Sequence, residues 1–187
     1  MLKHINLITL LVVTALVFSS CKKEDPDIPN EEEVITTLNY TLTPAGGGSA
    51  ITLSFVDLDG DGGNAPTITG GTLAKNETYT GSMELLNETE TPAEDVTIEI
   101  AEEDAEHQFF FQSDISNLNV AYNDTDANGN PVGLSSTLST DSVVASGTLT
   151  VILRHEPNKS AAGVSGGDIT NAGGETDIEV LFPINVQ

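Results

Sequence analysis

The sequence predicts a mainly β protein, an antiparallel β-sandwich of the immunoglobulin-like or jelly-roll kind with one short helix. Apolar and polar residues alternate with period two in many short, threonine-rich segments, and clusters of Gly, Asn and Asp separate these segments. Such alternation is typical of strands with one buried face, and turn signals at short spacing favour a sandwich or a barrel. A small up-and-down β-barrel is the alternative. With a single cysteine in 187 residues, the fold must depend on packing or bound ions.

The strands are expected in the following order along the chain. Two alternating segments at residues 38–42 and 51–55 flank three consecutive glycines and predict a β-hairpin. Further strands are expected around residues 79–85, 118–122, 149–153 and 178–186, where apolar residues again fall at alternate positions. Three phenylalanines in a row, Phe109, Phe110 and Phe111, predict the start of a buried strand rather than a ligand-binding set.

One segment departs from this alternation and predicts the helix. Thr91 is placed as an N-cap, Pro92 as the first helical residue, and Glu94 three residues after Thr91 as the partner that completes a capping box. The following residues 95–107 are rich in Glu and Ala, although strand-like alternation is also present. We therefore expect one short helix that crosses an end of the β structure.

The N-terminus resembles a bacterial lipoprotein signal. Lys3 precedes an apolar run at residues 7–18, and Ser19 and Ser20 lead to Cys21. This run is shorter than the ~20 residues of a membrane-spanning helix. Residues 1–20 are thus predicted to be a signal peptide that is removed before Cys21, and the resemblance implies that Cys21 is lipidated. More than one acyl chain would make this anchoring stable.

Residues 21–33 are predicted to be an acidic, flexible tether, and residues 34–187 a single β domain. Prolines among charged residues cannot bury apolar area, so the tether is expected to be extended. Its acidity resembles the export signal of some surface lipoproteins of the Bacteroidota. We expect an outer-membrane lipoprotein of a Gram-negative bacterium that faces the periplasm or the cell surface.

The charge balance limits the class of partner. The chain has 29 acidic residues against 6 Lys and Arg, a formal net charge of −23, which repels nucleic acid and anionic lipid headgroups. The acidity either attracts divalent cations or keeps the protein soluble. The expected partners are the membrane, through the lipid anchor, and an unidentified protein or glycan, but no nucleic acid.

Two loops have the spacing D-x-D-x-[DN]-G, which resembles the first half of a calcium-binding loop. Alternate carboxylates on a tight turn can direct oxygen ligands at one hard cation. The twelfth position, where an EF-hand has a glutamate, is Ile68 in the first loop and Ser135 in the second. The alternative is that both are ordinary turns. No cofactor is required, and Ca²⁺ is the predicted ion. The candidate ligands are Asp57, Asp59 and Asp61 in the first loop and Asp124, Asp126 and Asn128 in the second.

The remaining candidates give weaker signals. His107 and His155 are expected at the surface or at strand ends, and a two-histidine metal site with Glu106 or Glu156 would require them to meet in space. No nucleophile motif is present, and Cys21 would be consumed by the lipid. We therefore predict that the protein is not an enzyme.

Two segments suggest surface features. The long Gly-rich segment at residues 156–175 is the expected recognition surface, with polar groups such as Asn158 and Lys159 available to a partner. Asp141, Ser142 and Val143 resemble an O-glycosylation sequon of the Bacteroidota, which implies a glycan on Ser142.

The segments DLDGDGGN at residues 57–64, EHQFFF at 106–111 and LRHEPNK at 153–159 resemble those of a family of small, uncharacterised Bacteroidota lipoproteins. Some members are described as having the type 1 periplasmic-binding fold, which implies a large doubly wound α/β protein, and the strand pattern here disagrees with that fold. The expected function is that of a cell-envelope lipoprotein with a non-catalytic binding or structural β domain, stabilised by calcium. The alternative is a β-barrel carrier of a small apolar ligand.

Overall fold

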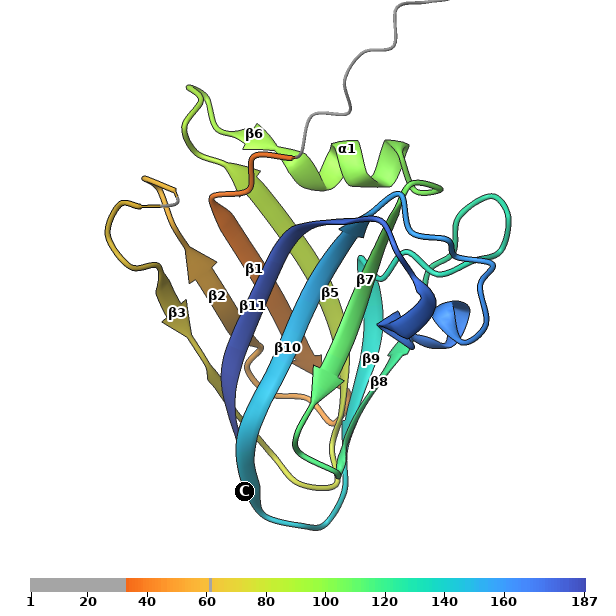
Figure 1. Cartoon of the computed structure of the whole chain (residues 1–187). Coiled ribbons are helices and arrows are strands. Elements are labelled where there is room, and N and C mark those ends of the chain that lie inside the picture. Colours follow the sequence, from red (N-terminus) through yellow and green to blue (C-terminus); the bar gives the residue numbers. More distant parts are fainter. Residues whose placement is uncertain (1–32, 61) are drawn as a thin grey trace, which may run out of the picture. The chain divides into compact units, whose positions relative to one another are not determined.

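The computed structural model describes residues 33–60 and 62–187, and within these ranges the strands form two sheets (Figure 1). The seven-stranded sheet has the order β3-β2-β1-β5-β9-β8, and β6 pairs with β5. Its strands are β1 (Thr37–Pro44), β2 (Ile51–Val56), β3 (Thr67–Thr69), β5 (Thr78–Asn87), β6 (Glu94–Asp95), β8 (Leu118–Tyr122) and β9 (Ser135–Thr140). The four-stranded sheet has the order β4-β11-β10-β7. Its strands are β4 (Gly71–Leu73), β7 (His107–Ser113), β10 (Ala145–His155) and β11 (Glu175–Val186).

The predicted β-sandwich is confirmed. The described strands pair antiparallel except β4 with β11, and the two sheets do not close into the small barrel that was the alternative. The predicted hairpin is β1–β2, in which Leu38 lies opposite Phe55 and Leu42 opposite Ile51. The three phenylalanines lie in β7, as expected.

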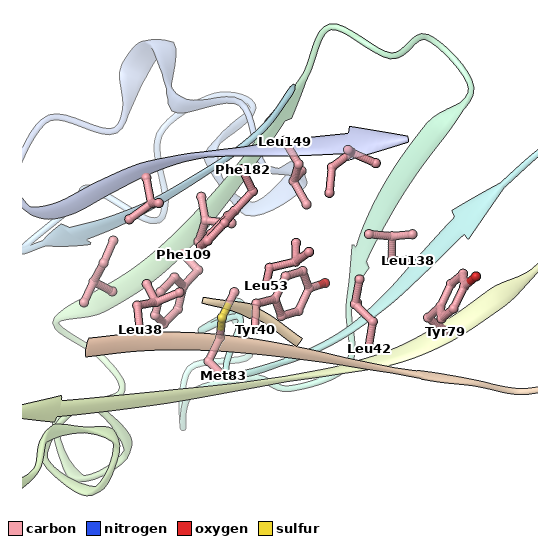
Figure 2. Close-up of a cluster of buried hydrophobic side chains, with 14 of the residues drawn as sticks. Leu38, Tyr40, Leu42, Leu53, Tyr79, Met83, Phe109, Leu138, Leu149 and Phe182 are labelled. Carbon is pink, nitrogen blue, oxygen red and sulfur yellow. The ribbon is translucent and has the colours of Figure 1, made fainter. Parts of the chain in front are cut away.

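The core lies between the sheets because each strand directs alternate apolar side chains inward. In β11 every second residue from Ile178 to Val186 is buried. Figure 2 shows the side chains from the two sheets meeting, among them Leu38, Tyr40, Phe109 and Phe182. The buried hydroxyl of Tyr40 is satisfied by the Ser136 Oγ at 2.7 Å.

The helix begins four residues later than the sequence predicts. Helix α1 (Val96–Glu102) has Asp95 as its N-cap, and the Asp95 side chain accepts a hydrogen bond of 3.1 Å from the Thr97 backbone N–H. The predicted cap at Thr91 is wrong because Glu94 and Asp95 pair with the end of β5 as strand β6. Helix α1 crosses the end of the sandwich (Figure 1). No helix in the described residues is long and apolar enough to cross a membrane.

The long segment at residues 156–175 folds against the outer face of the four-stranded sheet. It contains two 3₁₀ turns, η1 (Val164–Gly166) and η2 (Ile169–Asn171). Val164 and Ala172 form a small second core with Phe110 and Ile152. Lys159, which was expected to face a partner, is only 5% exposed, because its ammonium group bonds to neighbouring loops.

Candidate metal centre

His107 and His155 are direct neighbours inside one end of the sandwich. His107 begins β7, His155 ends β10, and the two residues lie opposite each other in the antiparallel register. Both lie at strand ends, as one of the two expected positions had it, but their side chains are 0% and 3% exposed, so the expected surface position is wrong. The imidazole rings stack with centroids 4.5 Å apart and an interplanar angle of 29°. The meeting in space that the sequence could not establish is therefore present.

Asp177 lies beside both histidines because of a β-bulge. Leu153 of β10 pairs with Ile178, but the next residue, Arg154, pairs with Thr176, so Asp177 is the extra residue of β11. A bulge redirects a side chain that strict alternation would place on the other face. The Asp177 side chain is fully buried. Its Oδ1 is 3.8 Å from His155 Nδ1 and its Oδ2 is 3.9 Å from His107 Nε2.

Three glutamates surround this group. Glu33, at the start of the described chain, places Oε1 3.9 Å from His107 Nε2, and Glu106 places Oε2 4.0 Å from His155 Nε2. Glu103, the C-cap of α1, forms a second compact set with Glu33 and His107. In this set, and in the set of His107, His155 and Asp177, the potential ligand atoms all lie within 4.8 Å of one another.

The surroundings of His107 favour its neutral form. Burial and the neighbouring His155 lower the pKa of His107. Its Nδ1 lies 3.3 Å from the Glu103 carbonyl oxygen. A carbonyl can only accept, so this contact assigns the proton to Nδ1 and leaves Nε2 with a free lone pair. Within the described residues Nε2 has no hydrogen-bond partner. The unprotonated Nε2 faces the carboxylates of Glu33 and Asp177, and a positive ion between them could bind to all three groups.

Glu99 of α1 extends the acidic group. Burial, together with a hydrogen bond to Glu33, raises the pKa of Glu99 to about 7. Burial also raises the pKa of Glu33. Two carboxyl groups can be hydrogen-bonded to each other only when one of them is protonated, so the pair retains a proton well above the ordinary range of a glutamate. A cation at His107 would compete with this proton for Glu33.

The donor set fits a divalent transition metal. Imidazole suits Zn²⁺, Cu²⁺, Fe²⁺ and Ni²⁺, whereas Ca²⁺ and Mg²⁺ prefer oxygen ligands throughout. A Zn²⁺ ion held at about 2.0–2.2 Å from each ligand requires ligand atoms roughly 3–4 Å apart. The two measured separations, 3.9 Å from His107 Nε2 to Asp177 Oδ2 and 3.8 Å from His155 Nδ1 to Asp177 Oδ1, fall at the upper end of this range and involve different carboxylate oxygens.

The first predicted calcium loop folds as a hydrogen-bonded turn. Asp57 Oδ1 accepts a 3.0 Å bond from the Gly60 backbone N–H. Asp59 Oδ2 accepts bonds from the backbone and side-chain nitrogens of Asn64 at 3.1 and 2.6 Å. The backbone bond, followed by the side-chain bond, lowers the pKa of Asp59. The third candidate, Asp61, lies outside the described residues.

The carboxylates of the second loop organise the loop itself. Asp124 accepts backbone bonds from Gly133 and Ser135 at 2.8 and 2.9 Å. Asp126, only 5% exposed, accepts bonds from the backbone N–H groups of Asn128 and Asn130 and from Lys159 Nζ. Burial opposes its ionisation, but these bonds outweigh burial and lower the pKa of Asp126. Asn128 itself is exposed, and calcium binding here stays a prediction.

Of the two predicted modification sites, Ser142 lies within the described residues. Ser142 is exposed in the turn between β9 and β10, where Asp141 Oδ1 accepts a 2.8 Å bond from the Val143 backbone N–H. Cys21 lies outside the described residues.

Comparisons with protein-family models and with curated proteins find no match. Among solved structures, the chain is similar to domains 4 and 5 of the S-layer protein SbsC, with 14% sequence identity and a TM-score of 0.31. The similarity covers 79% of this chain and 75% of that chain. A structural similarity this weak carries no argument about function.

Proposed function

We propose that this protein binds a divalent transition-metal ion, with Zn²⁺ as the reference ion, in a β-sandwich anchored at the cell envelope. His107, His155 and Asp177 are the proposed ligands, and Glu33, with Oε1 3.9 Å from His107 Nε2, is the proposed fourth group. The observation that carries the proposal is the convergence of two neighbouring imidazoles and a carboxylate in the closed end of the sandwich.

The proposed role is binding rather than catalysis. The side chains of His107 and Asp177 are completely buried, so an ion between them would be shielded from a substrate. A shielded ion can stabilise the end of the sandwich where β7, β10 and β11 meet α1, because binding to the folded state alone adds to the free energy of unfolding.

The location is proposed from the sequence. Lipidation of Cys21 would place the domain at the outer membrane of a Gram-negative bacterium, on either face, with residues 21–33 as the tether. A protein or glycan partner is compatible with this position. The alternative was a β-barrel carrier of an apolar ligand, and the two sheets do not close into a barrel.

The test is metal binding by the full chain, purified in non-ionic detergent and stripped with a chelator. Zn²⁺ at 100 times its dissociation constant should stabilise the fold by about 2.7 kcal/mol. For a domain of this size this raises the melting temperature by roughly 5–10 °C. Asp177→Asn removes a ligand charge with little change in volume and should weaken binding, measured by calorimetry, at least about 100-fold. Asp114→Asn, an exposed carboxylate at the opposite end of β7, is the matched control.

Two results would contradict the proposal. The first is a melting curve that does not respond to Zn²⁺, Co²⁺, Ni²⁺ or Mn²⁺. The second is equal zinc affinity in Asp177→Asn and in Asp114→Asn.

A parallel titration with Ca²⁺ tests the two acidic loops. A calcium-specific rise that Asp57→Asn and Asp59→Asn abolish would assign the ion to the first loop instead.

A further inference from the structure

An acidic cavity opens beside the metal centre. It has a volume of about 440 Å³ and lies between the N-terminal segment, the loop after β2 and the start of β11. Among the described residues that line it, none is basic, and five are acidic: Glu33, Asp57, Asp59, Asp177 and Glu179. The first D-x-D segment of the sequence therefore contributes to the wall of this cavity.

The cavity and the metal centre share two residues. Glu33 and Asp177 line the cavity, and each places a carboxylate oxygen 3.9 Å from His107 Nε2. The His107 side chain is 0% exposed, and its Nε2 has no hydrogen-bond partner in the described part of the chain. His107 is not among the described residues that line the cavity, so Glu33 and Asp177 are the residues that connect the metal centre and the cavity.

We propose that this acidic cavity captures hydrated divalent cations and is their route to His107, with Glu33 as the group that a cation must pass. The proposal rests on the metal centre proposed above. Carboxylates gathered in a concave site focus the negative potential, and such focusing raises the local cation concentration and the association rate by about 10- to 1000-fold. Glu33 is the more exposed of the two shared groups, with 15% exposure of its side chain against 0% for Asp177.

The charge of the cavity also specifies the form of the metal. Three carboxylates that are not proposed ligands, Asp57, Asp59 and Glu179, attract a hydrated cation and repel an anionic metal chelate. The captured species is therefore the free aqua ion.

A competing approach passes Glu106, whose side chain is 56% exposed and lies near His155. The two approaches are separable because they use different carboxylates.

The test is the rate of Co²⁺ association with the chelator-stripped full chain in non-ionic detergent, followed by stopped-flow absorption. The variant Asp57→Asn/Asp59→Asn/Glu179→Gln removes three charges from the cavity and keeps side chains of similar size. Its association rate constant should fall about tenfold at low ionic strength, and the difference should shrink in 0.5 M salt. The variant Glu84→Gln/Asp114→Asn/Asp141→Asn removes three exposed charges elsewhere and should match the wild type.

The outcomes separate this proposal from the metal centre itself. If the cavity variant binds Co²⁺ as fast as the control variant, the cavity is not the route. If Glu106→Gln slows association and the cavity variant does not, the route passes Glu106. If the wild type binds no Co²⁺ at all, the proposed metal centre is wrong. Melting temperatures of all variants, measured with chelator, verify that each one is folded.

Discussion

At the scale of single residues, Lys159 joins three segments through its buried ammonium group, close to the proposed metal centre. Its ammonium group donates to the Asp104 and Pro131 carbonyl oxygens and to Asp126 Oδ2, and both charged side chains are almost fully buried. Lys159→Met should lower the free energy of unfolding by about 3 kcal/mol, because it leaves the Asp126 charge buried without its partner. Urea unfolding measures the loss. The control is Lys75→Met at an exposed position, expected within about 0.5 kcal/mol of wild type. Equal stability of the two variants would contradict this assignment.

The sequence predicted only part of the candidate site at this scale. Asp57 and Asp59 were singled out by their spacing, and they do line the acidic cavity. Residues two apart in a strand point to the same face. His107 is two residues from the inward Phe109 and His155 two residues from the inward Leu153, and this spacing could have predicted that both histidines point inward. Their mutual contact depends on the register of β7 against β10, which local pattern does not determine. Asp177 could not be found, because a bulge reverses the face that alternation assigns to it.

At the scale of elements, helix α1 places Glu99 against Glu33 and makes the end of the sandwich sensitive to pH. The pKa of Glu99 rises from 4.5 to about 7. As the pH rises, the unfolded chain therefore loses the Glu99 proton before the folded chain does. The contribution of this proton to the free energy of unfolding is complete below pH 4.5 and is lost as the pH rises to about 7. Glu99→Gln, measured with chelator at pH 8, should then raise the melting temperature by a few degrees. This corresponds to about 1 kcal/mol or less in the free energy of unfolding, because the side chain is partly exposed. At pH 4.5 the substitution should change the melting temperature little.

The pH experiment needs a variant comparison because His107 acts in the opposite direction. Because the pKa of His107 is lowered in the folded state, its neutral side chain stabilises the fold fully above the ordinary histidine pKa of 6.5. This contribution decreases as the pH falls below that value. The pH ranges of the two effects overlap below pH 6.5, so only the difference between variant and wild type isolates the effect of Glu99. Glu102→Gln, on the same helix and exposed, is the matched control. A Glu99→Gln difference that does not change with pH would contradict the shared proton.

Strands with clear apolar alternation were predictable, including the five residues of β8, whereas the six residues of β9 were missed because two of its three buried residues, Ser136 and Thr140, are polar. The strands β1, β2, β5, β10 and β11 have enough alternating residues for the pattern to show. Strands β3 and β4 have three residues each and β6 has two, too few for a periodicity. The helix was expected in the correct region, but its start depends on β6 pairing with β5, which is a tertiary contact.

At the scale of the whole molecule, alternation identified a sandwich but not its strand order. A sheet with one apolar face must bury that face against another apolar surface. Many strands that are apolar on one face only therefore predict two sheets packed against each other. Which strand joins which sheet depends on long-range pairing, as in β5, whose neighbours β1 and β9 are far apart in sequence. The same long-range pairing brings residues 107, 155 and 177 to one place.

The membrane attachment of the whole molecule should depend on Cys21 alone. With a net charge of −23, the chain is repelled by anionic headgroups, so electrostatic attraction cannot hold it at a bilayer. Wild-type protein should therefore remain in the membrane fraction after a 1 M salt wash, which removes proteins held by charge. Cys21→Ser, expressed as the full chain, should lose the acyl chains, which an intact-mass measurement detects. Salt-labile wild-type protein, or a wild-type mass without acyl chains, would exclude the lipid anchor. Unchanged zinc binding by Cys21→Ser would establish that anchoring and metal binding are independent properties of the chain.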